Sequence, residues 1–221
     1  MSGPAAPKTL ADPMAVEHRR ALVAEAPHLR PLSGYLEALR AAHGAVPAPD
    51  PLDGGAEARL LLLLEAPGPR IVRTHLVSRD NPTGTAANLF RYLAEAGLPR
   101  RDTLIWNAVP WVIHAPGAPN RAPTRAEVAA GLATLPRLLA CLPRLRAVVL
   151  AGRVAGGAAP WFAAHRPDLA LVAMPHPSPT YICTSPDVAA RIRAALAEAA
   201  AALGQGHPGQ GHPEPALEPA P

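Results

Sequence analysis

Lysine, cysteine and aromatic residues are scarce in this 221-residue chain, and each shortage excludes some chemistry. Lys8 is the only lysine among 21 basic residues, so a reaction through an amine nucleophile has a single candidate. Cys141 and Cys183 are the only cysteines and lie far apart, which rules out a four-thiolate cluster and argues against a disulfide framework. Aromatic residues make up 4% of the chain, and we therefore expect an aliphatic core.

Long hydrophobic runs and nucleotide-binding glycine motifs are also missing. Residues 1–12 are rich in Pro and Ala and charge interrupts residues 13–30, so we expect no signal peptide and no membrane contact, and predict a cytoplasmic protein. The segment 152–157 lacks the spacing of a dinucleotide fingerprint, and no loop with Gly-Lys-Ser/Thr occurs. These absences argue against nucleotide cofactors.

The charge of the chain is unevenly distributed. The 17 acidic residues include Glu214 and Glu218, and no Lys or Arg lies beyond residue 203, so residues 1–203 carry a formal charge of +6 against +4 for the whole chain. Such an excess suits a polyanionic partner, although it is also common in proteins that never touch nucleic acid.

Strand and helix patterns alternate four times along the chain. The apolar segments 59–64, 103–109, 146–151 and 169–174 predict strands, and helical spacing or capping signals separate them. Ahead of the first strand, the spacing of residues 13–39 predicts two helices, and residues 45–55 are expected to be a linker. Thr85 is expected to cap one later helix, Thr124 to begin another that runs to about Leu142, and Ser185 to cap the final helix. This alternation predicts an α/β fold, a three-layer α/β/α sandwich with a small four-stranded parallel sheet. We expect residues 1–12 to be a disordered N-terminus, residues 13–203 to form one domain, and residues 204–221 to be a disordered Gly/Pro/His tail.

Polar residues stand at or just beyond the ends of the predicted strands. Glu65 directly follows a five-leucine run, and His176 follows the strand predicted over 169–174. In open α/β sheets the carboxyl edge of the strands is where ligands bind. Glu65 alone would also fit a strand-capping residue in an ordinary turn. The second polar residue at a strand end, His176, favours a ligand-binding or catalytic site instead. Asn107 lies within an apolar strand, where its amide would serve a ligand or its own loop backbone.

Six short segments, in this order, resemble motifs of the uracil-DNA glycosylase superfamily, and most closely its branch typified by thermophile and bacterial iron-sulfur enzymes. They are Glu65-Ala66-Pro67-Gly68, Gly84-Thr85-Ala86-Ala87-Asn88-Leu89-Phe90, Trp106-Asn107-Ala108-Val109, Asn120-Arg121-x-Pro123-Thr124-x-x-Glu127, Ala151-Gly152-Arg153-x-Ala155 and His176-Pro177-Ser178-Pro179. The resemblance implies a monomeric DNA repair enzyme that flips uracil out of DNA and hydrolyses its N-glycosidic bond, with DNA containing uracil or another damaged base as its partner.

The resemblance also implies roles for individual residues. Glu65 and His176 would be catalytic, the first orienting water and the second donating a hydrogen bond to the departing base. The residues expected around the base are Ala66, Pro67, Gly68, Pro82 and Asn107, with Asn107 reading its edge. The residues expected to contact DNA are Ser178, Pro179, Thr180, Tyr181, Arg79, Arg121 and Arg153. Thr180 or Tyr181 could fill the vacated stack, and Tyr181 is the preferred wedge.

The sequence departs from that branch at several positions. Leu64 replaces the leading Gly of the first motif, and Pro82 stands where the branch has the aromatic residue that stacks on the base. The cluster cysteines are missing, so no iron-sulfur centre, other metal or cofactor is expected. The Lys-Arg-Arg-Ile-His insert of the covalent-trapping relatives is missing too, although His114 lies nearby. With Lys8 in a predicted tail, strand nicking through a Schiff base is not expected.

Three other functions fit the same residues. The chain could be a DNA-binding relative that kept the fold and lost the chemistry, because Leu64 and Pro82 alter the pocket. It could remove another deaminated base such as hypoxanthine or xanthine, or a mismatched thymine, because Gly68 offers no bulk against a 5-methyl group. An unrelated α/β hydrolase or transferase is the third alternative.

Overall fold

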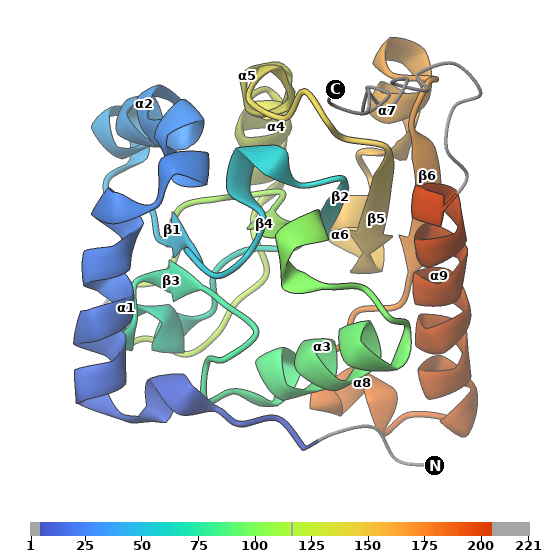
Figure 1. The fold of residues 1–221 in the computed structure, drawn as a ribbon, viewed down its shortest axis with the longest axis horizontal. Coiled ribbons are helices and arrows are strands. Elements are labelled where there is room, and N and C mark those ends of the chain that lie inside the picture. Colours follow the sequence, from blue (N-terminus) through green and yellow to red (C-terminus); the bar gives the residue numbers. More distant parts are fainter. Residues whose placement is uncertain (1–4, 116, 205–221) are drawn as a thin grey trace, which may run out of the picture.

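The computed structural model describes residues 5–115 and 117–204. Its centre is a four-stranded parallel sheet in the order β4-β2-β5-β6 (Figure 1). The strands are β2 (Leu60–Leu64), β4 (Thr103–Asn107), β5 (Ala147–Ala151) and β6 (Ala170–Met174). All four predicted strands are present, because a short apolar run is most stable as a strand that the protein covers on both faces.

Helices surround this sheet and make it a three-layer α/β/α sandwich (Figure 1). The last helix, α9 (Pro186–Gly204), packs against β5 and β6, whereas α6 (Gly152–Gly156) packs against β2 and β5. The other helices around the sheet are α3 (Gly84–Glu95), α4 (Arg125–Leu132), α5 (Leu135–Ala140), α7 (Ala159–His165) and α8 (Pro179–Ile182). The predicted fold class is confirmed.

The chain before the sheet is helical, as its spacing predicted. α1 (Pro13–Glu25) is followed by the 3-10 helix η2 (Pro27–Leu32) and then by α2 (Ser33–His43). A second, two-stranded parallel sheet joins β1 (Ala48–Pro49) to β3 (Leu76–Val77). Strands of two residues have no periodicity to detect, and the sequence did not predict them. Further 3-10 turns are η3 (Gly55–Glu57) and η5 (Arg100–Asp102).

Part of the N-terminus that was predicted to be disordered is folded. The 3-10 helix η1 (Thr9–Ala11) buries Leu10 against Ala48 and Leu76, leaving it 2% exposed. The backbone N–H of Leu10 also donates to the carbonyl of Asp80 at 3.2 Å. The prediction for residues 1–12 is therefore wrong over this turn, because one buried leucine anchors it. The predicted tail lies outside the described residues from residue 205 onward, and Gly204 ends α9.

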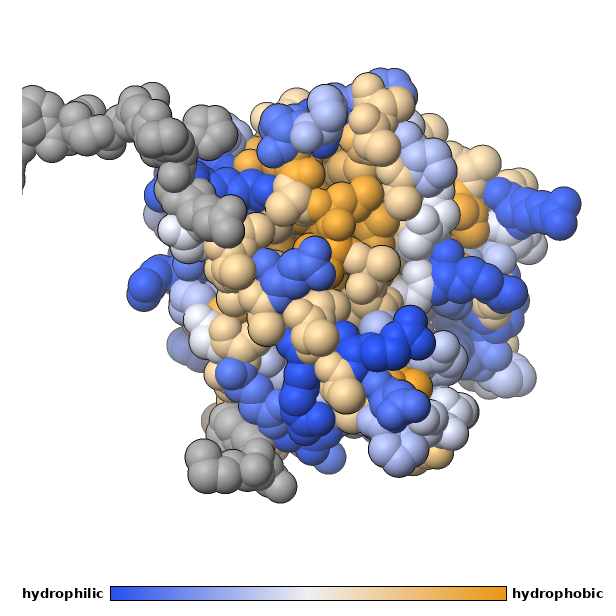
Figure 2. Space-filling view, turned by 90° about the vertical axis from the view of Figure 1, so that its right-hand side faces the viewer, coloured by the Kyte–Doolittle hydropathy of each residue, from blue (hydrophilic) through white to orange (hydrophobic). Residues whose placement is uncertain are grey.

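The core is aliphatic, and Leu60, Leu61, Leu62 and Leu63 of β2 are fully buried at its centre. One face of the molecule is seen in Figure 2, where hydrophobic side chains gather in the upper part and hydrophilic ones in the lower part. Among the described residues, no helix has both the length and the apolar character needed to cross a membrane.

Candidate active site

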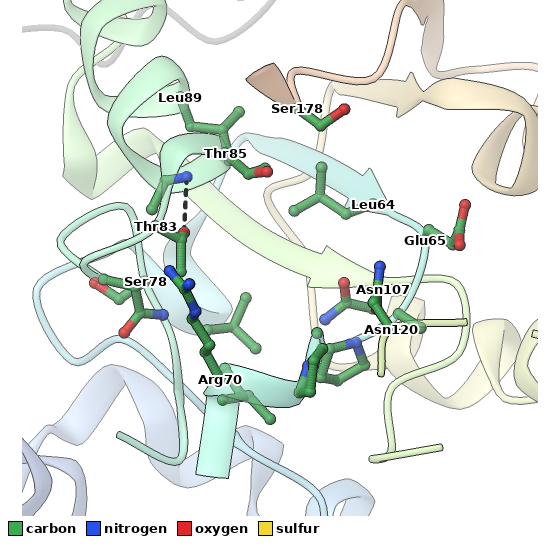
Figure 3. Close-up of a pocket in the computed structure, with 18 of the residues that line it drawn as sticks. Leu64, Glu65, Arg70, Ser78, Thr83, Thr85, Leu89, Asn107, Asn120 and Ser178 are labelled. Atoms are coloured by element: carbon green, nitrogen blue, oxygen red, sulfur yellow. Dashed lines mark hydrogen bonds between the residues drawn. The ribbon is translucent and has the colours of Figure 1, made fainter. Parts of the chain in front are cut away.

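The strands of the large sheet end at one edge, and a cleft of about 990 Å³ opens there. The chain runs from β2 to β4 on one side and then crosses back over β2 to β5 on the other, so the connections change direction beside β2. Ligands of open α/β sheets bind at such switch points. Glu65 after β2, Asn107 at the end of β4 and His176 after β6 all line this cleft, and Figure 3 shows the first two.

The turn after β2 fixes the position of Glu65. The backbone N–H groups of Ala108 and Val109 donate to the carbonyls of Leu64 and Glu65 at 2.8 and 2.9 Å, which extends the pairing of β2 with β4 past the last residue of each strand. The Glu65 carboxyl is half-buried, and burial raises its pKa above the ordinary value while the positive charge of Arg153 opposes the shift. Glu65 is the only acidic residue among the described residues that line the cleft.

A backbone hydrogen bond selects the tautomer of His176. The N–H of Ser178 donates to His176 Nδ1 at 3.2 Å, so in the neutral ring the proton lies on Nε2. Burial lowers the pKa of His176 below its ordinary value. The side chain is therefore a neutral imidazole near pH 7, with Nε2 as its hydrogen-bond donor.

The turn that carries His176 is held from two sides. Asn88 of α3 donates from Nδ2 to the carbonyl of Pro177 at 2.9 Å. The N-terminus of α3 also packs tightly on this turn, since a Cβ added to Gly84 would lie 2.2 Å from Cγ of Pro179. On the other side, Gly152 has φ +85 and approaches the histidine itself. α3 and the turn after β5 thus position the imidazole.

Asn107 lies at the floor of the cleft. Its residue is 5% exposed and pairs in register with Leu64, so the amide is fixed at the sheet edge. Figure 3 shows Asn120 beside it. The turn after Asn107 is covered closely by α4, because a Cβ on Gly131 would lie 2.1 Å from the carbonyl oxygen of Ala108. A buried amide that faces a cleft can donate and accept hydrogen bonds at the edge of a planar ligand.

Most of the residues predicted for the site line the cleft. They are Glu65, Ala66, Pro67, Gly68, Pro82, Asn107, Arg121, His176, Ser178, Thr180 and Tyr181. Pro179 packs on α3 instead, and Arg153 is exposed and lies close enough to Glu65 to influence its carboxyl. Arg121 pairs with Glu127, with 2.6 Å between Nη2 and Oε1. Tyr181 is 46% exposed on α8.

Arg79 does not belong to this surface. It is 3% exposed, donates to the hydroxyl of Thr103, and its Nη2 lies 3.4 Å from Oδ1 of Asp53. It is part of a buried ion network, which consists of Arg19, Arg79, Arg100, Asp50, Asp53 and Asp80. The prediction that Arg79 contacts DNA is therefore wrong, because acidic residues of two segments, Asp50 and Asp53 in one and Asp80 in the other, hold the arginines inside.

Several cleft residues were not assigned to the site from sequence. Arg70 and Arg73 lie in the 3-10 helix η4 (Pro69–Arg73) and line the cleft together with Asn120 and His114. The sequence shows the arginines of this loop, but it does not show which of them face the cleft. Within the described residues, no group of three or more His, Cys, Asp or Glu side chains could hold a metal ion, and Cys141 and Cys183 are free thiols.

One comparison with known proteins identifies a family. The model of the uracil DNA glycosylase superfamily matches residues 51–199. That range contains all four strands of the large sheet and the turns that carry Glu65, Asn107 and His176. A search of curated proteins finds no match.

Proposed function

We propose that this chain, which belongs to the uracil DNA glycosylase superfamily, is a DNA repair glycosylase that hydrolyses the N-glycosidic bond of uracil in DNA. Membership of the family supports a hydrolase that acts on bases in DNA. The observation that carries the proposal is that Glu65, Asn107 and His176, which come from three different strand ends, line one cleft. The target nucleotide must leave the base stack to reach them.

His176 assists the departure of the base. When the bond between C1′ and N1 breaks, its electron pair leaves with uracil, and negative charge develops on the ring and its O2 atom. The Nε2–H of His176 donates a hydrogen bond to this anion. A fixed donor aimed at developing charge typically contributes about 3 kcal/mol to the transition state. A neutral imidazole is available for this task because burial lowers the pKa of His176.

Glu65 acts on the sugar side of the same bond. Its carboxylate orients a water molecule toward C1′, offsets the positive charge of the oxocarbenium ion, and takes up the proton that the water loses. The half-buried position of Glu65 suits this role, because its charge is only partly screened by solvent.

Asn107 selects the base. Its amide can donate to O4 of uracil and accept from N3–H, whereas the corresponding edge of cytosine has these groups reversed. A buried polar pair of this kind rejects a mismatched partner strongly, since the wrong base would leave both amide atoms without a hydrogen bond.

The remaining cleft residues bind the DNA around the extruded nucleotide. Ser178 binds a phosphate group. The exposed ring of Tyr181 is suited to insert into the base stack, where it fills the space that the nucleotide leaves. Lys8 is not among the residues that line the cleft, so the enzyme leaves the abasic strand intact. We propose that it works as a monomer in the cytoplasm.

A labelled oligonucleotide with a single uracil tests the proposal. The oligonucleotide is offered single-stranded and opposite G or A, and alkali then reveals abasic sites. We expect strand cleavage only after alkali. Glu65→Gln and His176→Ala should lose at least about 100-fold in rate, which is the usual cost of removing a group that acts in the transition state. Both should retain most of their affinity for the DNA.

Two surface variants serve as matched controls. Glu57→Gln removes an exposed carboxylate that pairs with Arg144, and His18→Ala removes an exposed imidazole on α1. Both should cleave at the wild-type rate. Wild-type protein that binds but releases no uracil would overturn the uracil assignment. Hypoxanthine, xanthine and G·T substrates would then distinguish another glycosylase from a DNA-binding relative.

A further inference from the structure

Two arginines of η4 project into the cleft without a counterion. Arg70 and Arg73 both line it, and side chains three residues apart in a 3-10 helix point in the same direction. Figure 3 shows Arg70 extending from η4 toward the side of the cleft that carries Thr83. Both side chains are exposed, and within the described part of the chain neither forms a hydrogen bond or an ion pair.

The other charged residues of the neighbourhood differ from this pair. Arg121 on the cleft wall is neutralised by Glu127, and Arg79 is buried with Asp53. Glu65 is the only acidic side chain among the described cleft residues, and Arg153 faces it. Two like charges held side by side without an acidic neighbour repel each other until an anion binds between or beside them.

We propose that Arg70 and Arg73 form a phosphate clamp for the DNA strand that carries the extruded nucleotide. This inference rests on the proposed function for the identity of the anion. A phosphate backbone matches the charge of the pair, and arginine binds phosphate oxygens through two parallel N–H groups. The clamp lies on η4, whereas Ser178 and Thr180 lie at the start of α8 on the other cleft wall, so the strand is held on both sides of the nucleotide.

The salt dependence of DNA binding tests the clamp. The double variant Arg70→Gln/Arg73→Gln is compared with wild type by fluorescence anisotropy on undamaged and uracil-containing duplexes over a series of KCl concentrations. Each lost phosphate contact reduces the magnitude of the negative slope of log K against log salt by about 0.9 on duplex DNA, so the slope should become less steep by about 1.8. The fall should be equal for both duplexes, because phosphate contacts carry no base information.

A variant with the same loss of charge at the opposite edge of the sheet is the control. Arg30 lies in η2, which packs on η3 at the start of β2, and Arg144 pairs with Glu57 of η3. Arg30→Gln/Arg144→Gln should keep the wild-type slope. An unchanged slope in the η4 variant, or an equal fall in both variants, would overturn the clamp. The single variants are measured the same way if the double variant fails to fold.

Binding to undamaged DNA does not require turnover, so the two proposals can fail separately. A wild-type protein without glycosylase product, combined with the expected fall in slope, would reject the proposed reaction and keep the clamp. Product formation with an unchanged slope would reject the clamp alone.

Discussion

The backbone of Gly152 lies so close to His176 that a Cβ atom added to the glycine would sit 2.9 Å from the histidine Cβ. Gly152→Ala should therefore displace the imidazole. A misplacement of about 1 Å can cost about 100-fold in rate, and we expect a loss of this size in the single-turnover rate of base release. DNA affinity should change much less.

A variant of a second glycine distinguishes the effect of this contact from the effect of backbone strain. Gly97 has φ +66, close to the +85 of Gly152, but a Cβ there would meet nothing within 4 Å. Each alanine should cost about 1 kcal/mol in the free energy of unfolding for its left-handed backbone, but only Gly152→Ala should lose activity. An equal loss in both variants would show that the contact with His176 has no role.

Asn88 should position His176 through the turn that follows it. Asn88→Ala removes the 2.9 Å hydrogen bond to the carbonyl of Pro177, and we expect about a fivefold to tenfold fall in kcat, the equivalent of about 1 kcal/mol, with a smaller change in KM. Asn88→Asp is the sharper test, because a carboxylate keeps the shape of the side chain but cannot donate to the carbonyl.

The neighbour of Asn88 provides the control for this effect. Arg91 donates to Asn88 Oδ1 at 2.7 Å, and Arg91→Gln leaves the donor side of the amide free to reach Pro177. Its activity should stay close to wild type. Wild-type kcat in Asn88→Asp would exclude a positioning role for the asparagine.

His176 should titrate below its ordinary pKa of 6.5, because burial favours the neutral ring. The folded protein then binds this proton less readily than the unfolded chain does. The stability that the residue contributes is present above pH 6.5 and is lost as the pH falls through the folded pKa. A proton NMR titration of the imidazole, assigned by its disappearance in His176→Gln, measures the shift. A midpoint at or above 6.5 would contradict it.

Asp53 should change the pH dependence of stability in the opposite direction. Burial raises its pKa from 3.8 to about 6, although Arg79 and Arg100 oppose the shift. Folding therefore favours the protonated carboxyl, so the contribution of Asp53 to stability improves as the pH falls from above 6 toward 4. The stability of Asp53→Asn relative to wild type should therefore be higher at pH 8 than at pH 4, by up to about 3 kcal/mol, on top of a pH-independent cost for leaving Arg79 without its carboxylate partner. Urea unfolding at several pH values measures the difference.

An exposed carboxylate supplies the comparison for Asp53. The pKa of Asp168 is lowered by its hydrogen bonds from Arg166, so the stability of Asp168→Asn relative to wild type should be slightly lower at pH 8 than at pH 4, the reverse of Asp53→Asn. A stabilisation of both variants at high pH would point to net charge as the cause.

The sequence was sufficient to predict the large sheet, because its strands are apolar runs that end at turns. It was also sufficient for the capping box at Thr124 and for the start of α9, where Ser185 accepts from the N–H of Asp187. Helix details were less accurate. The N-cap of α3 is Thr83 and not Thr85, since threonines flank Gly84 on both sides and either could serve. The helix predicted to continue to Leu142 is broken into α4 and α5, because Gly131 packs on Ala108 and Pro136 stands in the first turn of a new helix.

The proposed catalytic side chains of the cleft could be predicted from the sequence, but the loop side chains that point into it could not. Glu65, Asn107 and His176 could be identified because strand ends fix where a side chain must lie. Loop cations were different, because the same stretch holds Arg70, which lines the cleft, and Arg79, which is buried. Only the partners of Arg79 distinguish the two, and Asp53, which pairs with Arg79, stands in the Pro/Gly-rich segment that was expected to be a linker.

The strand order has a consequence for biosynthesis. Hydrogen-bonded neighbours such as β2 and β5 are far apart in the chain, so the sheet is dominated by non-local contacts that close slowly. Glu65 leaves the ribosome long before His176 does, and the loops that hold them cannot meet until β6 has joined the sheet. A nascent or truncated chain therefore presents a carboxylate without its imidazole, and the complete pair of groups exists only in protein that has finished folding.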